Sequence, residues 1–398
     1  MMSQLVPPHG SASLKPLLAP ERERAEERER AGRLRRIPLD SRAVSDVLML
    51  AMGAYTPLDG FMGYEDWRGC CVEMKLASGL FWPIPITLPV GHDVADSIHP
   101  EEEVALIESR SGKTLAIMEV LEKYGIDKAV EAEHVYRTTD ARHPGVAKLM
   151  KQGEVNLAGR VQVLSEGEYP RRYPHLYIRP AESRALFLKK GWSRVAAFQT
   201  RNPMHRSHEH LVKIALEVLD GVFIHQVLGK LKPGDVPAEV RTRAVEAMVD
   251  NYFRPETVIQ AGYPIEMRYA GPREALFHAL IRQNFGCSHL IVGRDHAGVG
   301  DYYGPFDSHH IFDQLWDGAL LTEALKLDVT FYCRRCAAIA TARTCPHDSK
   351  FHLSISGTRL REMLSSGVEV PPEFSRPEVV EILREYYRSL RTESGSAS

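Results

Sequence analysis

Two patterns of hydrophobic and polar positions follow one another along the chain. From Leu39 to about Pro180, short apolar runs such as residues 81–88 and 103–107 are separated by glycine, proline and charged positions. Short apolar runs with such boundaries are typical of β-strands joined by turns. We therefore expect residues 1–175 to form a mostly β N-terminal domain.

Between Val195 and Gly300, apolar strands alternate with amphipathic helices. This alternation predicts parallel βαβ units packed around one sheet. Residues 176–325 are therefore expected to form a doubly wound α/β domain. The expected strands are residues 195–198, 222–227 and 289–292, and the expected helices begin near Arg206 and Pro237 and extend from Pro272 to Phe285.

The composition is that of a globular protein with more than one domain. Of 398 residues, 44% are hydrophobic and 26% are charged, and a single core seldom grows beyond about 250 residues. The formal net charge of −2 gives no overall basic field for nucleic acid or an anionic membrane. No apolar run approaches the ~20 residues of a membrane span, and the first residues lack the apolar core of a signal peptide. We expect a cytoplasmic protein with no nucleic-acid or membrane partner.

Candidate chemistry is concentrated directly after the first strand of the α/β domain. Residues 199–208 read QTRNPMHRSH and lead into a helix. In open α/β sheets, ligands bind at the carboxyl ends of strands, where the free N–H groups of a helix N-terminus attract phosphate. His205 and His208 are three positions apart and therefore share one side of the first helical turn. Arg201 adds a planar guanidinium suited to a tetrahedral oxyanion.

A second polar loop follows another strand of the same sheet. Residues 293–300 read GRDHAGVG and come directly after the strand at 289–292, so both loops should meet over one ligand. The glycines allow close approach of the backbone to an anion, and Arg294 adds a positive charge. Asp295 is expected to orient Arg294 or a histidine.

A third segment, residues 267–275, reads MRYAGPREA and again joins a strand to a helix. Pro272 is well placed as the first helical residue. Arg268 and Arg273 are candidates for holding anions, and the competing interpretation is an ordinary helix start.

Together these segments resemble ATP sulfurylase (sulfate adenylyltransferase), whose hallmarks are Q-x-R-N-P-x-H-R-x-H and G-R-D-H-A-G. Both hallmarks are intact at residues 199–208 and 293–298, and the likeness extends to residues 53–62 and 269–275. It covers about residues 35–365. The resemblance implies an α/β protein in which a Rossmann-like nucleotidyltransferase domain lies between an N-terminal PUA-like β domain and a small C-terminal domain.

The resemblance also implies roles for residues of both loops. The catalytic residues would be Thr200, Arg201, Asn202, His205, His208 and Arg294. Sulfate would be bound by Gln199, Arg201 and the backbone of Ala297. The nucleotide would be contacted by Gln199, Arg201, Asn202, His205, His208, Gly293, Arg294, Asp295, His296 and the backbone near Val329.

The implied reaction converts ATP and sulfate reversibly into adenosine 5′-phosphosulfate and diphosphate, with Mg²⁺ accompanying ATP. Because sulfate needs no deprotonation, we expect direct in-line attack on the α-phosphate, with no general base and no covalent intermediate. No G-x-x-x-x-G-K-[ST] loop follows Leu325, so the reaction is expected to stop at adenosine phosphosulfate. A homodimer is the expected assembly.

A cysteine cluster marks the small C-terminal domain expected at residues 326–398. Cys333 and Cys336 form a C-x-x-C pair, and Cys345 and His347 follow closely. Three thiolates and one imidazole make a closed tetrahedral set for structural Zn²⁺, with His352 as a second candidate for the fourth ligand. Free thiols in a loop are the competing interpretation.

Residues 354–359, which read SISGTR, are expected to open a helix. The segment resembles the second phosphate-contacting motif of the wider nucleotidyltransferase group. Simple helix capping by its hydroxyl residues is the alternative.

Two rival functions follow from the same residues. An adenylyl transferase of the HxGH group could act on another phosphate-bearing acceptor, although Gln199, Arg201 and Ala297 argue against it. An RNA-binding module built from the PUA-like domain and the zinc hairpin is disfavoured by the near-neutral charge and the lack of a basic stripe interleaved with aromatic residues.

Overall fold

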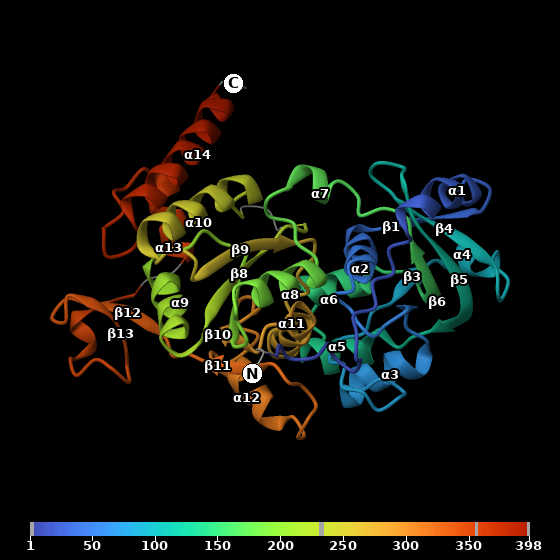
Figure 1. The fold of residues 1–398 in the computed structure, drawn as a ribbon, viewed down its shortest axis with the longest axis horizontal. Coiled ribbons are helices and arrows are strands. Elements are labelled where there is room, and N and C mark those ends of the chain that lie inside the picture. The colour runs from blue at the N-terminus through green and yellow to red at the C-terminus, as the bar shows by residue number, and fades with distance from the viewer. Residues whose placement is uncertain (1–3, 231–234, 355–356, 396–398) are drawn as a thin grey trace.

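Three sheets follow one another in the computed structural model, which describes residues 4–230, 235–354 and 357–395. The N-terminal sheet lies on one side of the molecule and the parallel sheet at its centre, while the C-terminal segments lie on the opposite side (Figure 1). Within the described ranges no helix is long and apolar enough to cross a membrane.

The N-terminal part is organised by a six-stranded sheet of order β1-β4-β5-β6-β2, in which β3 also pairs with β6. Its strands are β1 (Arg35–Leu39), β2 (Gly60–Phe61), β3 (Leu88–Val90), β4 (Glu103–Glu108), β5 (Thr114–Gly125) and β6 (Val155–Val163). Its helices are α1 (Glu21–Ala31), α2 (Ser41–Ala51), α3 (Tyr64–Glu73), α4 (His92–Asp96), α5 (Lys128–Tyr136) and α6 (Pro144–Met150). The region is therefore less purely β than its pattern of apolar runs predicts.

The central sheet is parallel throughout and has the order β11-β10-β7-β8-β9. Its strands are β7 (Val195–Thr200), β8 (Gly221–Val227), β9 (Val258–Tyr263), β10 (His289–Val292) and β11 (Glu323–Lys326). The accompanying helices are α7 (Tyr169–Arg172), α8 (Pro180–Lys189), α9 (Arg206–Val218), α10 (Ala238–Tyr252), α11 (Pro272–Phe285), α12 (Asp307–His310) and the 3₁₀ turn η1 (Ile311–Gln314). The strand order reverses beside β7, as in a Rossmann-like doubly wound fold, and confirms the expected α/β architecture.

Alternating residues of the central strands pack into two different cores. Along β7, Val195 and Ala197 belong to the cluster that contains α11, whereas Ala196 and Phe198 belong to the cluster that contains α9 and α10. Successive strand residues point to opposite faces of a sheet, so helices cover both faces of this one. The apolar character of the whole strand follows from this double burial.

The C-terminal part contains a three-stranded antiparallel sheet and two helices. The strands, in the order β13-β12-β14, are β12 (Thr330–Cys333), β13 (Ala338–Thr341) and β14 (His352–Ser354). The helical elements are η2 (Ser349–Phe351), α13 (Gly357–Ser366) and α14 (Pro377–Gly395). Helix α14 makes extensive contact with α10, so the C-terminal helices close one face of the α/β domain (Figure 1).

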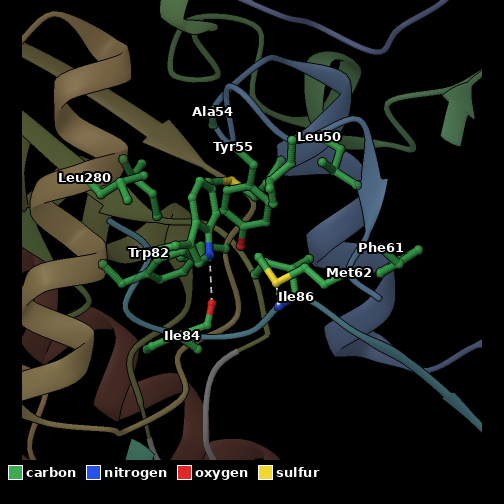
Figure 2. Packing of buried hydrophobic residues seen from close by; sticks show 14 of the residues in the cluster. Leu50, Ala54, Tyr55, Phe61, Met62, Trp82, Ile84, Ile86 and Leu280 are labelled. Atoms are coloured by element: carbon green, nitrogen blue, oxygen red, sulfur yellow. Dashed lines mark hydrogen bonds between the residues drawn. The ribbon is translucent and has the colours of Figure 1, made fainter. Parts of the chain in front are cut away.

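The N-terminal and central parts share one hydrophobic core. Tyr55 and Trp82 pack against Phe277 and Leu280 of α11, with the Tyr55 and Phe277 rings 5.4 Å apart. Figure 2 shows Tyr55, Trp82 and Leu280 together, with the hydrogen bond from the indole nitrogen of Trp82 to the carbonyl of Ile84, which is 2.8 Å long. The two parts are therefore joined by apolar packing as well as by the chain.

Candidate active site

Both predicted loops open onto one cavity of about 500 Å³ at the carboxyl ends of β7 and β10. A topological switch point of this kind is where ligands bind in open α/β sheets. The lining includes every residue that the sequence placed in the catalytic, sulfate or nucleotide sets, namely Gln199, Thr200, Arg201, Asn202, His205, His208, Gly293, Arg294, Asp295, His296, Ala297 and Val329.

Hydrogen bonds within the chain hold the turn after β7 in place. The Thr200 hydroxyl donates to the Asn202 carbonyl at 2.7 Å and accepts the Asn202 N–H at 3.1 Å. The buried guanidinium of Arg241, from α10, donates to the Arg201 carbonyl at 3.0 Å. Arg361 of α13 donates to the amide oxygen of Asn202 at 3.0 Å. The Thr200 hydroxyl is thus used inside the turn, and the amide oxygen of Asn202 is held by Arg361.

The Arg201 guanidinium keeps one nitrogen available for an anion. It lies over the Tyr269 ring, 4.8 Å from the ring centroid, which supports its position without neutralising its charge. Its Nη1 is buried and has no hydrogen-bond partner among the described residues. A buried cationic nitrogen without a partner is costly unless a ligand satisfies it.

The two histidines of the H-x-x-H pair stack at the start of α9. Their ring centroids are 3.9 Å apart with an interplanar angle of 25°. The backbone N–H of His205 donates to Nδ1 of His208 at 3.5 Å, so the hydrogen of a neutral His208 ring is on Nε2. Burial lowers the pKa of His205 well below its usual value, and lowers the pKa of His208 to about 4. Both rings are therefore neutral donors at pH 7, and His205 is buried rather than turned fully outward.

The second loop has a backbone that brings its peptide groups close to the cavity. Asp295 and Ala297 both have positive φ angles, 54° and 57°. A Cβ at Gly298 would lie 1.9 Å from the Asp295 carboxylate, so a larger residue there would have to displace that side chain. The Ala297 carbonyl accepts the N–H of Gly271 at 3.2 Å, which ties the loop to the start of α11.

Sequence reasoning missed a stripe of buried polar residues on α11. Glu274, His278 and Arg282 are fully buried and follow one another at four-residue spacing. His278 contacts both loops, with 3.1 Å to Nε2 of Gln199 and 3.1 Å to Nε2 of His296. The signal was present, since polar residues spaced by four on an otherwise apolar helix form one stripe.

The prediction that Arg268 and Arg273 hold anions was wrong. Arg268 forms a buried ion pair with Asp46 of α2, at 2.7 and 2.9 Å. Arg273 donates to the carbonyls of Cys70, Cys71 and Pro83 in the N-terminal part, at 2.7–2.9 Å. Both guanidiniums join the two parts of the molecule, because Arg268, in the segment before α11, and Arg273, in the first turn of α11, face the N-terminal part.

The ATP-sulfurylase family model matches residues 174–386, more than half of the chain, and includes both loops of the cavity. The chain belongs to the ATP-sulfurylase family. A PUA-like domain model matches residues 6–166, which confirms the expected character of the N-terminal sheet.

Relatives in this family align over nearly the whole chain. The sulfate adenylyltransferase of Syntrophobacter fumaroxidans is 60% identical over 98% of this chain and 95% of its own length. That of Chlorobaculum tepidum is 59% identical over 97% of this chain and 96% of its own length. Among solved structures, the hexameric APS kinase from Thiobacillus denitrificans superposes with a TM-score of 0.74 at 26% identity, covering 96% of this chain and 68% of that chain.

Beside the cavity of this ATP-sulfurylase family member lies the cysteine cluster. One ligand atom each from Cys333, Cys336, Cys345 and His347 falls within 4.8 Å of all the others. The Cys336 and Cys345 sulfurs are 3.7 Å apart, and Nδ1 of His347 is 3.2–3.8 Å from the three sulfurs. Zn–S bonds of about 2.3 Å in a tetrahedron place sulfurs about 3.8 Å apart, so the donor set is compatible with Zn²⁺.

The second histidine candidate is less well placed. Nε2 of His352 is 3.5 Å from the Cys345 sulfur, and the ring stacks on Phe331 with centroids 3.6 Å apart. His347 contacts all three sulfurs, whereas His352 contacts the Cys345 sulfur, and the geometry therefore favours His347 as the fourth ligand.

The strands that carry the cysteine cluster, β12 and β14, run from the cavity wall. Thr330 and Val329 line the cavity at the start of β12, which ends at Cys333, and Ser354 lines it at the end of β14. The strands that carry the cysteine cluster therefore form part of the cavity wall. Of the expected phosphate-contacting segment at 354–359, Ile355 and Ser356 lie outside the described residues.

Proposed function

We propose that this chain is a sulfate adenylyltransferase, which converts ATP and sulfate reversibly into adenosine 5′-phosphosulfate and diphosphate. The observation that carries the proposal is the cavity in which Arg201 Nη1 and His205 Nδ1, both buried, lack hydrogen-bond partners among the described residues. Two unsatisfied nitrogens beside a helix N-terminus suit polyanionic ligands. The family and the names of its relatives supply the substrate class.

Residue roles follow from the placement of donors around the cavity. The guanidinium of Arg201, the amide of Gln199 and the backbone at Ala297 would bind sulfate. His205 and His208 would donate to the ATP phosphates from the first turn of α9. Asn202, Gly293, Arg294, Asp295, His296 and the backbone of Val329 would hold the remainder of the nucleotide, while Thr200 shapes the catalytic turn.

The reaction balances without a proton transfer. A sulfate oxygen attacks the α-phosphorus and forms the phosphate–sulfate bond, while the bond from the α-phosphorus to the bridging oxygen breaks and diphosphate carries the electron pair away. Neutral histidines and an arginine suit this chemistry, because they donate hydrogen bonds to developing negative charge and abstract nothing. The depressed pKa of His208, about 4, keeps the ring in its donor form over the physiological range.

Two metals accompany this proposal. Mg²⁺ would enter with ATP and neutralise charge on the departing diphosphate. Zn²⁺ would be held by Cys333, Cys336, Cys345 and His347, whose spacing fits a closed tetrahedral site with no position left for substrate. Its contribution would be to fix β12 and β14 beside the cavity.

The proposed activity is tested by exchange of labelled diphosphate into ATP. We expect exchange that depends on sulfate and is not supported by phosphopantetheine or a mononucleotide as acceptor. Exchange with one of those acceptors and not with sulfate would favour the rival adenylyl transferase. Salt-dependent RNA binding without ATP turnover would instead support the binding module.

The expected homodimer and cytoplasmic location stay predictions. Light scattering on the purified full-length chain measures the first, and a dimer mass is the expected result. Cell fractionation with detection of the native chain measures the second.

A further inference from the structure

A row of hydrogen-bonded polar side chains, some buried and some half-buried, runs behind the cavity and joins its two loops; it consists of Arg282, Tyr263, Gln199, His278 and His296. Nη2 of Arg282 donates to the Tyr263 hydroxyl at 2.9 Å, and that hydroxyl donates to Oε1 of Gln199 at 2.6 Å. Nε2 of Gln199 lies 3.1 Å from Nε2 of His278. Nδ1 of His278 lies 3.1 Å from Nε2 of His296. The row thus starts at a buried cation and ends on the second loop.

The arginine sets the direction of the first bonds. A guanidinium only donates, so the Tyr263 hydroxyl accepts from Arg282 and must place its own hydrogen on Gln199. The oxygen of the Gln199 amide therefore faces Tyr263, and its nitrogen faces His278. A flipped amide would leave the hydroxyl hydrogen of Tyr263 opposite an N–H group.

The same logic fixes both histidine rings. Because Gln199 donates, Nε2 of His278 accepts, and the hydrogen of the neutral His278 ring is on Nδ1. That hydrogen is donated to Nε2 of His296, so the only ring hydrogen of a neutral His296 is on Nδ1. Burial lowers the pKa of His278 and lowers that of His296 to about 3, so both rings are neutral at pH 7.

Among the described residues, Glu274 is the nearby acceptor that could take a hydrogen from Nε2 of His278 and so reverse the donor and acceptor roles along the row. Its Oε1 lies 3.4 Å from Nε2 of His278. The Glu274 carboxylate already accepts two backbone N–H groups, from Arg268 at 2.8 Å and Ala270 at 3.0 Å. The shorter contact of His278 is with Gln199, so the ring nitrogen accepts from the amide.

We propose that His278 is a positioning residue, held by Arg282, Tyr263 and Gln199 in the tautomer that turns Gln199 and His296 into fixed donors for the substrates. The inference rests on the proposed function. One hydrogen of the Gln199 amide nitrogen faces the sulfur of Met267 at 3.4 Å, a weak acceptor that a sulfate oxygen would replace. Without the row, the Gln199 amide could turn its oxygen to sulfate and repel it.

The first test measures the His296 tautomer directly. Two-bond ¹H–¹⁵N spectra of the full-length chain labelled with ¹⁵N-histidine distinguish a protonated ring nitrogen from an unprotonated one, and H296Q identifies the His296 signals. We expect hydrogen on Nδ1 of a neutral ring. Hydrogen on Nε2 would show that Glu274 takes the proton of His278 and would overturn the inference, whatever the activity.

The second test distinguishes the hydrogen bond of His278 Nε2 with Gln199 from that of His278 Nδ1 with His296. In H278Q, the amide reaches the place of Nε2 and keeps the contact with Gln199, so KM for ATP should rise about 3- to 10-fold while KM for sulfate changes little. In H278N, the amide takes the place of Nδ1 and keeps the contact with His296, so KM for sulfate should rise instead. Equal rises of both constants in both variants would mean a merely structural role.

The tyrosine gives an independent variant with a matched control. Y263F removes the hydroxyl that fixes the Gln199 amide, and KM for sulfate should rise about 3- to 10-fold. Y124F makes the same change at a buried tyrosine that donates to the Met62 carbonyl at 2.7 Å in the N-terminal part, and should leave both constants unchanged. An unchanged KM for sulfate in Y263F would contradict the inference. Loss of sulfate-dependent exchange in the unmodified chain, with the expected tautomer present, would instead contradict the proposed function alone.

Discussion

At the scale of single residues, the cavity contains cationic and neutral donors that the protein itself leaves unsatisfied. Arg201 carries a buried nitrogen without a partner among the described residues, and Tyr269 supports it with a ring face and not with an acidic group. The Asp295 carboxylate of the second loop interacts with this charge, and the unsatisfied nitrogen is left for an anion. A donor already in position needs no reorganisation when charge develops in the transition state.

Replacement of Arg201 by alanine should therefore lower kcat/KM for sulfate adenylylation by about 10²–10³, the usual effect of removing one such contact. Steady-state rates in both directions measure the change. The control is R243A, which removes an exposed arginine of α10 that pairs with Glu385 and should change the rate less than about twofold. A loss of only a few-fold in R201A would contradict the assignment.

Buried histidines also make stability depend on pH. His225 is fully buried, its two ring nitrogens lack partners among the described residues, and burial lowers its pKa well below 6.5. Below about pH 6.5 the unfolded chain binds a proton there that the folded chain does not. The stability contributed by this neutral ring is complete above pH 6.5 and is lost as pH falls.

H225F should remove that contribution. As pH falls from 6.5 to 5, the free energy of unfolding should decrease less steeply in the variant than in the wild type. The two slopes should differ by up to about 1.4 kcal/mol per pH unit. Urea titrations across this range measure the slope. H92F makes the same change at an exposed position and should keep the wild-type slope; equal slopes for H225F and wild type would contradict the prediction.

At the scale of elements, local patterns predicted the central domain well. Helix α11 and strand β10 have the bounds read from the apolar period and from Pro272, because these elements are set by local signals. The roles of Arg268 and Arg273 could not be read in this way. Their partners lie about 200 positions away, and only the packing of α11 against the N-terminal part brings them together.

The row behind the cavity likewise depends on long-range contacts that local sequence patterns do not predict. Gln199 and His296 were predicted from their loops, but His278 was not, since a histidine within a helix is more often an ordinary core residue. Its function follows from contacts with two loops that are 79 and 18 positions away. Spacing of polar residues by four along α11 was the available local sign.

The hairpin that carries Cys333, Cys336, Cys345 and His347 is an element whose role can be tested through its proposed zinc ion. The purified chain should contain one zinc, and C345S and H347A should each reduce the zinc content to about a tenth or less, because a tetrahedral site cannot lose a ligand without loss of affinity. Because β12 joins Cys333 to the cavity wall at Thr330, loss of zinc should also raise KM for ATP.

H352A is the matched histidine variant for that experiment. This variant removes a ring that stacks on Phe331 and contacts the Cys345 sulfur alone among the three sulfurs of the cluster, so it should keep its zinc. Elemental analysis by mass spectrometry measures the zinc content of all three variants. Loss of zinc in H352A and retention in H347A would reverse the assignment of the fourth ligand.

At the scale of the whole molecule, the PUA-like and Rossmann-like parts behave as one packed body. A single hydrophobic cluster contains Leu50 and Trp82 of the first part and Leu280 of the second (Figure 2), together with Phe277. The polar contacts cross the same boundary, since Asp46 of α2 accepts both from Arg268 and from the Tyr55 hydroxyl, the latter at 2.8 Å. Core packing shared in this way favours cooperative unfolding.

Breaking the buried pair at this boundary should therefore destabilise the whole chain. D46A leaves the guanidinium of Arg268, only 3% exposed, without its carboxylate, and removing one partner of a buried pair costs about 3–5 kcal/mol. Urea unfolding followed by tryptophan fluorescence and by circular dichroism should shift together to a lower midpoint, as one transition. E256A removes an exposed partner of Lys190 and should leave the midpoint close to that of the wild type. Two separate transitions in D46A would mean that the apolar core at α11 does not hold the two parts together.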